Sequence, residues 1–276
     1  MSQPDHVRAI SRLLGAVGDR LNPLVDLYRP YVDGLENLPR DGRFLLVGNH
    51  TATGMAEVFF IPYYVRRELG VRVRPLADRM MAAQRGPGRA LLAAYGGVVG
   101  HPHSARELMQ HNEAVLVFPG GGREIPKFKG EEYQLRWDGR SGFARVAIAH
   151  DYPIVPVGLV GGDDVYRALT ERDSAMGRFI EGVGERLSGR SDMAMPLVRG
   201  VGPTLLPRPQ RMYLRFGEAI DTVKPARARA ATWAQQVKGA TQEALEQILT
   251  DLQELRADDP FRALNPLAWR AAVQPA

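Results

Sequence analysis

The sequence has no cysteine, little lysine and no long apolar run. The absence of cysteine from 276 residues excludes disulfides, a thiolate nucleophile and a cysteine-ligated zinc site. No apolar stretch reaches the roughly 18 residues of a membrane-spanning helix. The first residues, MSQPDHVRAI, lack the apolar core of a signal peptide. We therefore expect a cytoplasmic location, within reach of a membrane surface.

Lysine occurs four times, so 32 of the 36 basic residues are arginine, and the net charge is +5. A basic surface suits anionic partners such as nucleic acid, lipid headgroups or phosphorylated co-substrates. The chain has no zinc-finger spacing, no RNP aromatic motif and no dense basic helix. We therefore expect no nucleic-acid partner.

Hydrophobic periodicity predicts an α/β fold with a mostly parallel central sheet flanked by helices, because strand and helix patterns alternate. The expected strands are 44–48, 71–78, 96–100, 114–121 and 153–161, with a half-exposed strand at 211–220. The expected helices are 57–69, 79–95, 104–111 with Ser104 as N-cap, 141–150 and a long C-terminal helix at 228–255. Residues 172–211 carry no assignable pattern.

Three segments are expected along the chain. Residues 1–31 form an N-terminal helical, membrane-proximal segment, because apolar side chains recur with helical period over residues 5–21. This amphipathic helix either packs on the domain or lies in a membrane interface. Residues 32–257 form the main domain, and residues 258–276 form a C-terminal tail.

The stretch LLVGNHTATGMAEVFF places His50 at the carboxyl end of a buried strand, with Glu57 seven residues later. A histidine there can take a proton from a hydroxyl near neutral pH, and a carboxylate can fix its tautomer. The residues alone leave two interpretations open, a catalytic base with its partner or a structural histidine.

The stretch VFPGGGREIPKFKGE follows another strand, and its glycines can expose backbone N–H groups to an anion. Arg123 adds a forked donor for phosphate or carboxylate, and Lys127 and Lys129 add positive charge. The alternative is a glycine-rich surface turn with solvated charges. No Gly-Lys-Ser/Thr follows, so this is not a Walker loop.

The histidines of HPHS, His101 and His103, have no third ligand in view, so we expect exposed loop histidines and no metal. The chain also has no G-x-S-x-G elbow for a serine hydrolase.

In order, the pieces GLENLP, LLVGNH, FPGGGRE, RSGFARVAIAHDYPIVPVGLVG and YLRFGEAID resemble the glycerolipid and lysophospholipid acyltransferases. The similarity is to the branch of diacylglycerol acyltransferases and phytyl-ester synthases, over residues 32–222. It implies a glycerol-phosphate-acyltransferase-like fold and transfer of a fatty acyl group from acyl-CoA or acyl carrier protein to a lipid alcohol. It implies no other cofactor.

The resemblance also implies roles for individual residues. His50 is the base and Glu57 its orienting carboxylate, and Met55 stands where many members have aspartate. Arg123 holds a phosphate or another polar part of the substrate. The other implied substrate-binding residues are Asn49, Phe118, Pro119, Gly120, Gly121, Gly122, Glu124 and Lys127.

The acyl chain needs an apolar surface or access to the bilayer, for which Met80, Met81, Leu91, Leu92 and residues 172–211 are candidates. A peripheral position on the inner face of the membrane is expected. Two other functions stay open, a non-catalytic lipid-binding protein on the same fold and an acyl-thioester hydrolase. Lysophosphatidate, diacylglycerol and long-chain alcohols all remain candidate acceptors.

Overall fold

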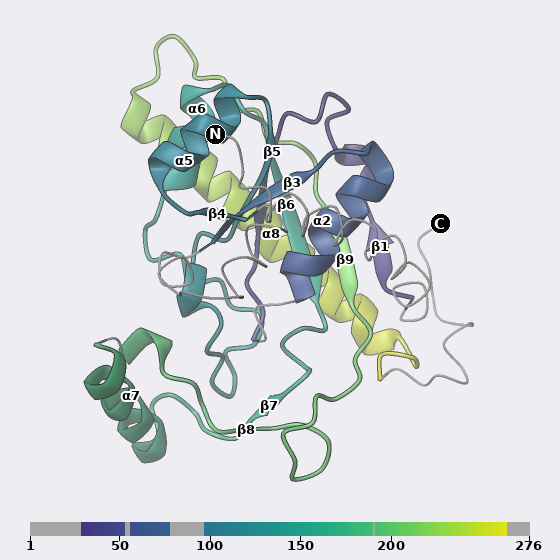
Figure 1. Ribbon diagram of the computed structural model, residues 1–276, viewed down its shortest axis with the longest axis vertical. Helices are drawn as coiled ribbons and strands as arrows, with labels where there is room; N and C mark the ends of the chain where they lie inside the picture. Colours follow the sequence, from purple (N-terminus) through teal and green to yellow (C-terminus); the bar gives the residue numbers. More distant parts are fainter. Residues whose placement is uncertain (1–28, 53–55, 78–96, 190, 264–276) are drawn as a thin grey trace, which may run out of the picture.

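A seven-stranded sheet forms the centre of the protein (Figure 1). The computed structural model describes residues 29–52, 56–77, 97–189 and 191–263. The strands lie in the order β1-β9-β6-β2-β5-β3-β4, and every neighbouring pair is parallel except β6 and β9. Their bounds are β1 Tyr31–Asp33, β2 Leu45–Gly48, β3 Val73–Ala77, β4 Val98–Val99, β5 Ala114–Val117, β6 Ile154–Val160 and β9 Tyr213–Phe216. The predicted mostly parallel sheet is confirmed.

Helices cover both faces of this sheet, because the central strands carry apolar side chains on both faces. Leu45 and Val47 of β2 pack with α5 (Pro102–Gln110), α6 (Gly142–Ala149) and α8 (Ala230–Asp258). Leu46 points the other way and packs with α2 (Ala56–Leu69). The alternation of single residues along β2 therefore builds two cores, one on each face.

The long C-terminal helix is confirmed as α8. Its buried stripe includes Val237, Leu245, Ile248, Leu249 and Leu252, and it ends at Asp258. The stripe lies against β6, where Gly158 leaves room for Ile248: a Cβ on Gly158 would come within 2.5 Å of the Ile248 Cγ2 atom. A glycine in the strand thus lets the helix approach the sheet closely.

Two predictions of detail are wrong. The N-cap of α5 is His101, whose Nδ1 accepts the backbone N–H of His103 at 3.1 Å, so the helix begins two residues before Ser104. The strand expected to be half-exposed is buried on both faces: Tyr213, Leu214 and Phe216 are all inaccessible to solvent. Tyr213 packs in the core that contains α8, and Leu214 and Phe216 pack in the core on the other face of the sheet.

The segment 172–211, unassigned from sequence, lies at one end of the molecule (Figure 1), and we call it the α7 unit. It contains α7 (Ala175–Ser188), the short helix η3 (Ser191–Met193) and β8 (Val198–Arg199), which pairs antiparallel with β7 (Arg167–Ala168). Ser174 begins α7 by accepting the backbone N–H of Gly177 at 3.0 Å. The remaining short helices are η1 (Leu35–Asn37) and η2 (Gly121–Arg123).

Several predictions concern residues that the structure does not describe. The amphipathic helix at 5–21, the helix at 79–95 with its apolar side chains, Met55 and most of the tail lie outside the described residues. β1 begins at Tyr31, one residue before the predicted start of the main domain. No helix in the described part of the chain has both the length and the apolar character to cross a bilayer.

Candidate active site

Three loops meet at the carboxyl end of the central strands. Strands β2, β5 and β6 are parallel neighbours, so the loops that follow them leave the sheet at one edge. His50 lies just after β2, Phe118 directly after β5 and Asp163 shortly after β6. The histidine and the glycine-rich block are therefore neighbours in space although more than sixty residues separate them along the chain.

Glu57 lies in the first turn of α2 and forms a hydrogen bond with His50 Nδ1. The Glu57 carboxylate is fully buried and also accepts the Thr51 backbone N–H at 3.1 Å and the Thr51 hydroxyl at 2.6 Å. A neutral imidazole whose Nδ1–H donates to a carboxylate presents Nε2 as its free acceptor. The structure thus brings together the two residues that the sequence paired, in an arrangement suited to a general base.

The His50 ring is fixed by Phe118 as well. The two rings are stacked, with centroids 4.5 Å apart and an interplanar angle of 15°. The His50 side chain is 13% exposed, so one edge of the ring reaches solvent or a ligand. Gly48 permits this stacking, because a Cβ there would lie 3.1 Å from Phe118 Cε1.

Three consecutive backbone N–H groups after β2 donate to three different buried carboxylates. His50 N donates to Glu124 at 2.9 Å, Thr51 N to Glu57 at 3.1 Å and Ala52 N to Asp163 at 2.7 Å. We call this arrangement the amide clamp. It fixes the backbone on which the histidine is mounted, and each carboxylate comes from a different part of the fold.

Two members of the clamp also bind the loop after β5. The second oxygen of Glu124 accepts the Arg136 backbone N–H at 2.9 Å, and that of Asp163 accepts the Tyr133 backbone N–H at 2.7 Å. Burial raises the pKa of Glu124 and raises the pKa of Asp163 to about 6, while the nearby Lys127 charge opposes both shifts. Asp163 and Tyr133 were not among the predicted site residues.

Lys127 and Asn49, both predicted to bind substrate, are buried and engaged within the protein. Lys127 is 4% exposed, and its Nζ donates to the Gln134 carbonyl at 2.8 Å. The Asn49 side chain donates to the Leu159 carbonyl at 3.0 Å and accepts the Leu159 N–H at 2.9 Å. Asn49 therefore extends the pairing of β2 with β6 and positions the next residue, His50.

The glycines of FPGGGRE form a tight turn around Glu124. A Cβ on Gly120 would lie 2.4 Å from the Glu124 carboxyl carbon, and Gly121 has a φ of +58°. The Gly121 N–H donates to the Phe118 carbonyl at 2.9 Å, so this group of the predicted anion nest faces inward. Arg140 donates to the carbonyls of Pro119 and Gly120 and holds the turn from the other side. Gly122 is buried in the same turn.

Arg123 is paired within the protein. Its Nη1 lies 2.7 Å from an Asp138 oxygen, and its Nε lies 2.8 Å from an Asp192 oxygen. The second contact joins η2 to η3, and thereby ties the α7 unit to the site. Two carboxylates neutralise the charge that the sequence assigned to a substrate phosphate.

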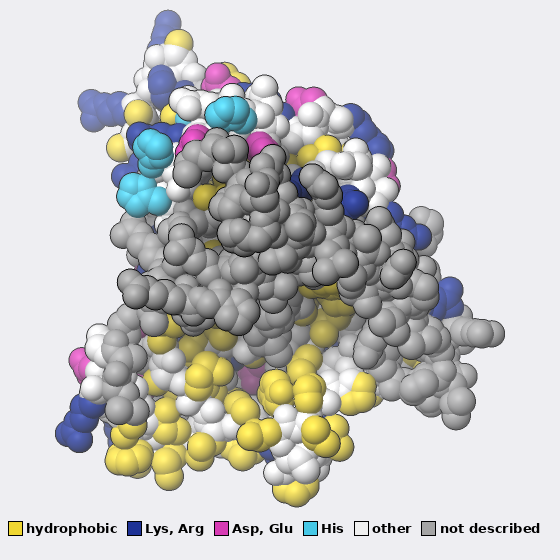
Figure 2. Space-filling model, in the orientation of Figure 1, with side chains coloured by type: hydrophobic (Ala, Val, Ile, Leu, Met, Phe, Trp, Pro, Cys, Tyr) yellow, Lys and Arg dark blue, Asp and Glu magenta, His cyan; other side chains and the backbone are white. Residues whose placement is uncertain are grey.

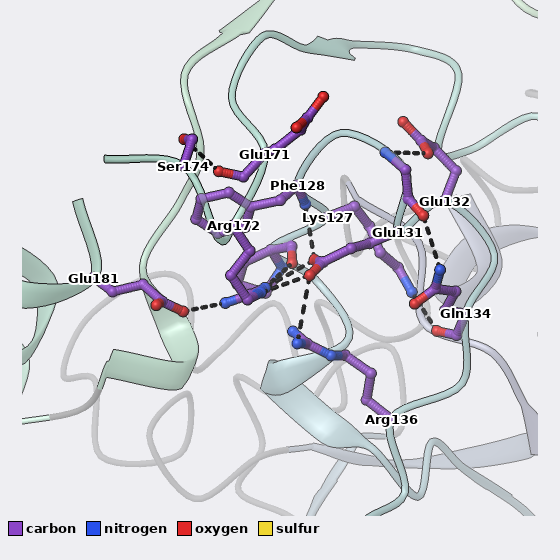
Figure 3. Close-up of polar contacts among 12 residues, drawn as sticks. Lys127, Phe128, Glu131, Glu132, Gln134, Arg136, Glu171, Arg172, Ser174 and Glu181 are labelled. Carbon is purple, nitrogen blue, oxygen red and sulfur yellow. Dashed lines mark hydrogen bonds and ion pairs between the residues drawn. The ribbon is translucent and has the colours of Figure 1, made fainter. Parts of the chain in front are cut away.

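Arg172 makes a second link between the α7 unit and the site (Figure 3). Its guanidinium donates two bonds to Glu131, at 2.6 and 2.8 Å, and a further bond to Glu181 of α7. It also lies 4.2 Å above the Phe128 ring. Because Phe128 follows Lys127 directly, α7 is anchored to the loop that carries the buried lysine.

A pocket of about 500 Å³ lies next to the turn that begins at Phe118. Phe118 and Pro119 form part of its wall, and Arg140, Phe143 and Arg145 form much of the rest. His101 and His103, in contrast, are exposed on α5, and no group of side chains within the described ranges could hold a metal ion.

Residues 29–160 match the protein family described as Acyltransferase. Phytyl ester synthase 2 of Arabidopsis thaliana is 29% identical over 252 residues, which cover 85% of this chain and 36% of that protein. A Bos taurus protein named DGAT1/2-independent enzyme synthesizing storage lipids is 28% identical over 151 residues, or 51% of this chain and 44% of that protein. The chain thus spans less than half the length of these relatives.

The crystal structure of a 1-acyl-sn-glycerophosphate acyltransferase from Thermotoga maritima covers 87% of this chain and 79% of its own, with 16% identity and a TM-score of 0.46. The family match and the sequence relatives confirm the resemblance that the motifs indicated. The matched segment runs from β1 to the end of β6 and contains His50, Glu57 and the FPGGGRE turn. Over residues 29–160 the chain is therefore similar to the acyltransferase family.

Proposed function

We propose that the protein transfers a fatty acyl group from a thioester donor, acyl-CoA or acyl carrier protein, to the hydroxyl of a lipid alcohol. The observation that carries this proposal is the His50–Glu57–Thr51 network at the carboxyl end of β2. A histidine that is held by a buried carboxylate and stacked on Phe118 can remove a proton from a hydroxyl. The match of residues 29–160 to the acyltransferase family supports the same reaction class.

In the proposed reaction, His50 Nε2 takes the proton of the acceptor hydroxyl as its oxygen attacks the thioester carbonyl. The new C–O bond forms while the carbonyl oxygen becomes a tetrahedral oxyanion. The intermediate then collapses, the C–S bond breaks, and the proton on His50 moves to the departing thiolate. The protein ends the cycle in its starting protonation state, and no acyl-enzyme forms.

A neutral acceptor, diacylglycerol or a long-chain alcohol, is favoured over lysophosphatidate. Arg123 was the sequence-based argument for a phosphorylated acceptor, and Asp138 and Asp192 already neutralise it. The relatives whose names are phytyl ester synthase and storage-lipid enzyme support the neutral choice. We further propose that the protein works as a peripheral enzyme on the cytoplasmic face of the membrane.

The decisive experiment follows a labelled acyl group from acyl-CoA and from acyl carrier protein to a panel of lysophosphatidate, diacylglycerol and phytol. The parent chain should acylate at least one alcohol. His50→Ala should lower the rate by about 10²–10⁴. The matched control is His103→Ala, whose exposed side chain lies outside the site and should leave the rate unchanged.

The same assay separates the two alternatives. A non-catalytic lipid-binding protein gives no labelled product with any acceptor. A thioester hydrolase releases free fatty acid at one rate with or without alcohols. Full transfer activity in His50→Ala would refute the base assignment.

A further inference from the structure

Exposed apolar side chains are concentrated at one end of the molecule (Figure 2). Of the nine large hydrophobic residues that are exposed in the described ranges, eight lie between residues 169 and 206. The most exposed are Leu205 at 69%, Phe179 at 67% and Leu206 at 65%. We call these eight residues the apolar end: Leu169, Met176, Phe179, Met195, Leu197, Val201, Leu205 and Leu206.

The apolar end is built from three kinds of element and is not a single accidental stripe. Met176 and Phe179 come from α7, and Leu169 and Leu197 lie opposite each other where the β7–β8 ribbon continues, joined by a backbone bond of 2.8 Å. The loop after β8 supplies Val201, Leu205 and Leu206 (Figure 1). A contiguous apolar surface of this kind marks an interaction site.

Charge at the apolar end identifies the partner. Arg167 and Arg199 are exposed and directly opposite each other in the register of β7 and β8. Like charges directly opposite in a strand pair are destabilising unless an anion lies between them. No acidic side chain within the described parts of the chain lies within ion-pair distance of either guanidinium. The nearby carboxylates of Glu171, Glu181 and Asp192 are all paired with other cations.

Side chains alternate along a strand, so Arg167 and Leu169 share one face of the ribbon with Arg199 and Leu197. The opposite face is the one that packs on the protein, because Ala168 is buried. The outward face therefore presents apolar side chains next to the guanidinium groups of Arg167 and Arg199. Such a surface matches the headgroup region of an anionic bilayer, where apolar groups enter the acyl layer and arginine meets lipid phosphate.

We propose that the apolar end docks on an anionic lipid bilayer. Two ion pairs join the segment 172–211, which carries most of the apolar end, to the loops of the active site. They are Arg172 with Glu131 and Arg123 with Asp192. Docking would therefore hold the loops around His50 at a fixed position relative to the membrane. The proposal rests on the proposed function only for the supply of the lipid acceptor, because the binding itself involves no catalysis.

The test is co-sedimentation of the full chain with vesicles, in the absence of acyl donor. One set of vesicles contains phosphatidylcholine alone, and the other contains phosphatidylcholine with phosphatidylglycerol. The parent should bind the anionic vesicles. Leu205→Ser/Leu206→Ser should lose at least tenfold in binding to them. Arg167→Gln/Arg199→Gln should lose about tenfold or more on anionic vesicles and nothing on neutral ones.

The matched control is Val223→Ser, because Val223 is 54% exposed and lies between β9 and α8, outside the apolar end. Control binding should equal that of the parent. Binding by the leucine variant at the parental level, or no binding by the parent, would overturn the proposal. Self-association of the parent that the leucine variant abolishes in sedimentation velocity would overturn it too, and would make this surface an interface between two copies.

An activity assay keeps this result separate from the proposed function. The leucine variant should lose transfer to an acceptor embedded in vesicles and retain transfer to a short-chain acceptor in solution. If the parent transfers to neither acceptor yet binds vesicles through the apolar end, the proposed function fails and the docking surface stands. Equal loss on both acceptors would contradict a docking role.

Discussion

At the scale of single residues, the site depends on carboxylates that face inward. Glu57 accepts from both the backbone and the hydroxyl of Thr51 while it contacts His50, so three protein groups fix its orientation. Glu57 lies in the first turn of α2 and reaches the His50 ring from there.

Glu57→Gln should lower kcat about 10–100-fold and leave KM nearly unchanged. The amide would present an NH2 group to one of the donors that now bind the carboxylate, which tilts the His50 ring and removes a charge that stabilises the imidazolium. The measurement is steady-state kinetics with the best acceptor of the panel. Glu68→Gln on the same helix, where Glu68 is half-exposed and pairs with Arg40, is the matched control and should change neither constant.

Asp163→Asn should change how stability depends on pH. Burial raises the pKa of Asp163 from 3.8 to about 6, so the folded protein binds this proton more tightly than the unfolded chain. The contribution of Asp163 to stability therefore falls as pH rises from about 4 to about 6, and is constant above that range.

The unfolding free energy of the parent, measured relative to Asp163→Asn by urea titration, should decline across that window by on the order of 1–3 kcal/mol. A difference that does not vary between pH 4 and pH 7 would contradict the assignment. Asparagine does not ionise, so the pH dependence of this difference in unfolding free energy reports the titration of Asp163.

Part of the site could be predicted from sequence and part could not. His50 and Glu57 are seven residues apart on a strand end and the next helix, so local spacing sufficed. Glu124 and Asp163 reach the same loop from 74 and 111 positions along the chain, and only the order of the strands brings them there. The pairing of Arg123 with Asp192 is equally non-local, so a charge that seemed available for substrate is used internally.

At the scale of elements, glycine at the interface of β6 and α8 controls how closely helix and sheet approach. Gly158→Ala should destabilise the fold by about 1–3 kcal/mol, because its new Cβ meets Ile248 at 2.5 Å in a packed core. Gly239→Ala on α8 should instead stabilise by about 0.5–1 kcal/mol, because nothing lies within 4 Å of the new Cβ and alanine is the better helix former. Urea denaturation of both variants checks these opposite signs, and a loss of stability in both would contradict the packing argument.

The elements that sequence patterns predicted are those that bury a periodic face. α8 and the central strands belong to this class, since their apolar residues recur with a regular period. α7 does not, because its large side chains Met176 and Phe179 point to solvent and three glycines interrupt it. β7 and β8 have two residues each, so they are too short to show an alternation of apolar and polar side chains in the sequence.

At the scale of the whole molecule, one buried ion pair joins distant parts of the chain. Arg211 and Asp259 are each 1% exposed and lie 2.6 Å apart, and Arg211 also donates to the Arg29 carbonyl at 2.8 Å. Burial alone would raise the pKa of Asp259, but hydrogen bonds from Tyr213, Phe261 and Arg211 hold it below its usual value. The start of β1, the start of β9 and the end of α8 thus share a single polar centre.

Arg211→Met should cost about 3–5 kcal/mol of unfolding free energy near pH 7, because it leaves a buried carboxylate unpaired. This loss should shrink as pH falls through the pKa of Asp259, since the depressed pKa stabilises only the ionised form. The double variant Arg211→Met/Asp259→Leu should recover most of the loss. A double variant as unstable as the single one would show that the pair holds these segments together in a way apolar packing cannot replace.

The amide clamp restricts the motion of the loop that follows β2. The N–H groups of His50, Thr51 and Ala52 belong to a loop, yet each is bonded to a buried carboxylate and not to water. Their hydrogen–deuterium exchange should therefore be as slow as that of β2 itself and should require opening of the sheet edge, not fraying of the loop. The segment that carries the proposed base would then have the persistence of a strand, and substrates would come to a histidine whose backbone is already in its working position.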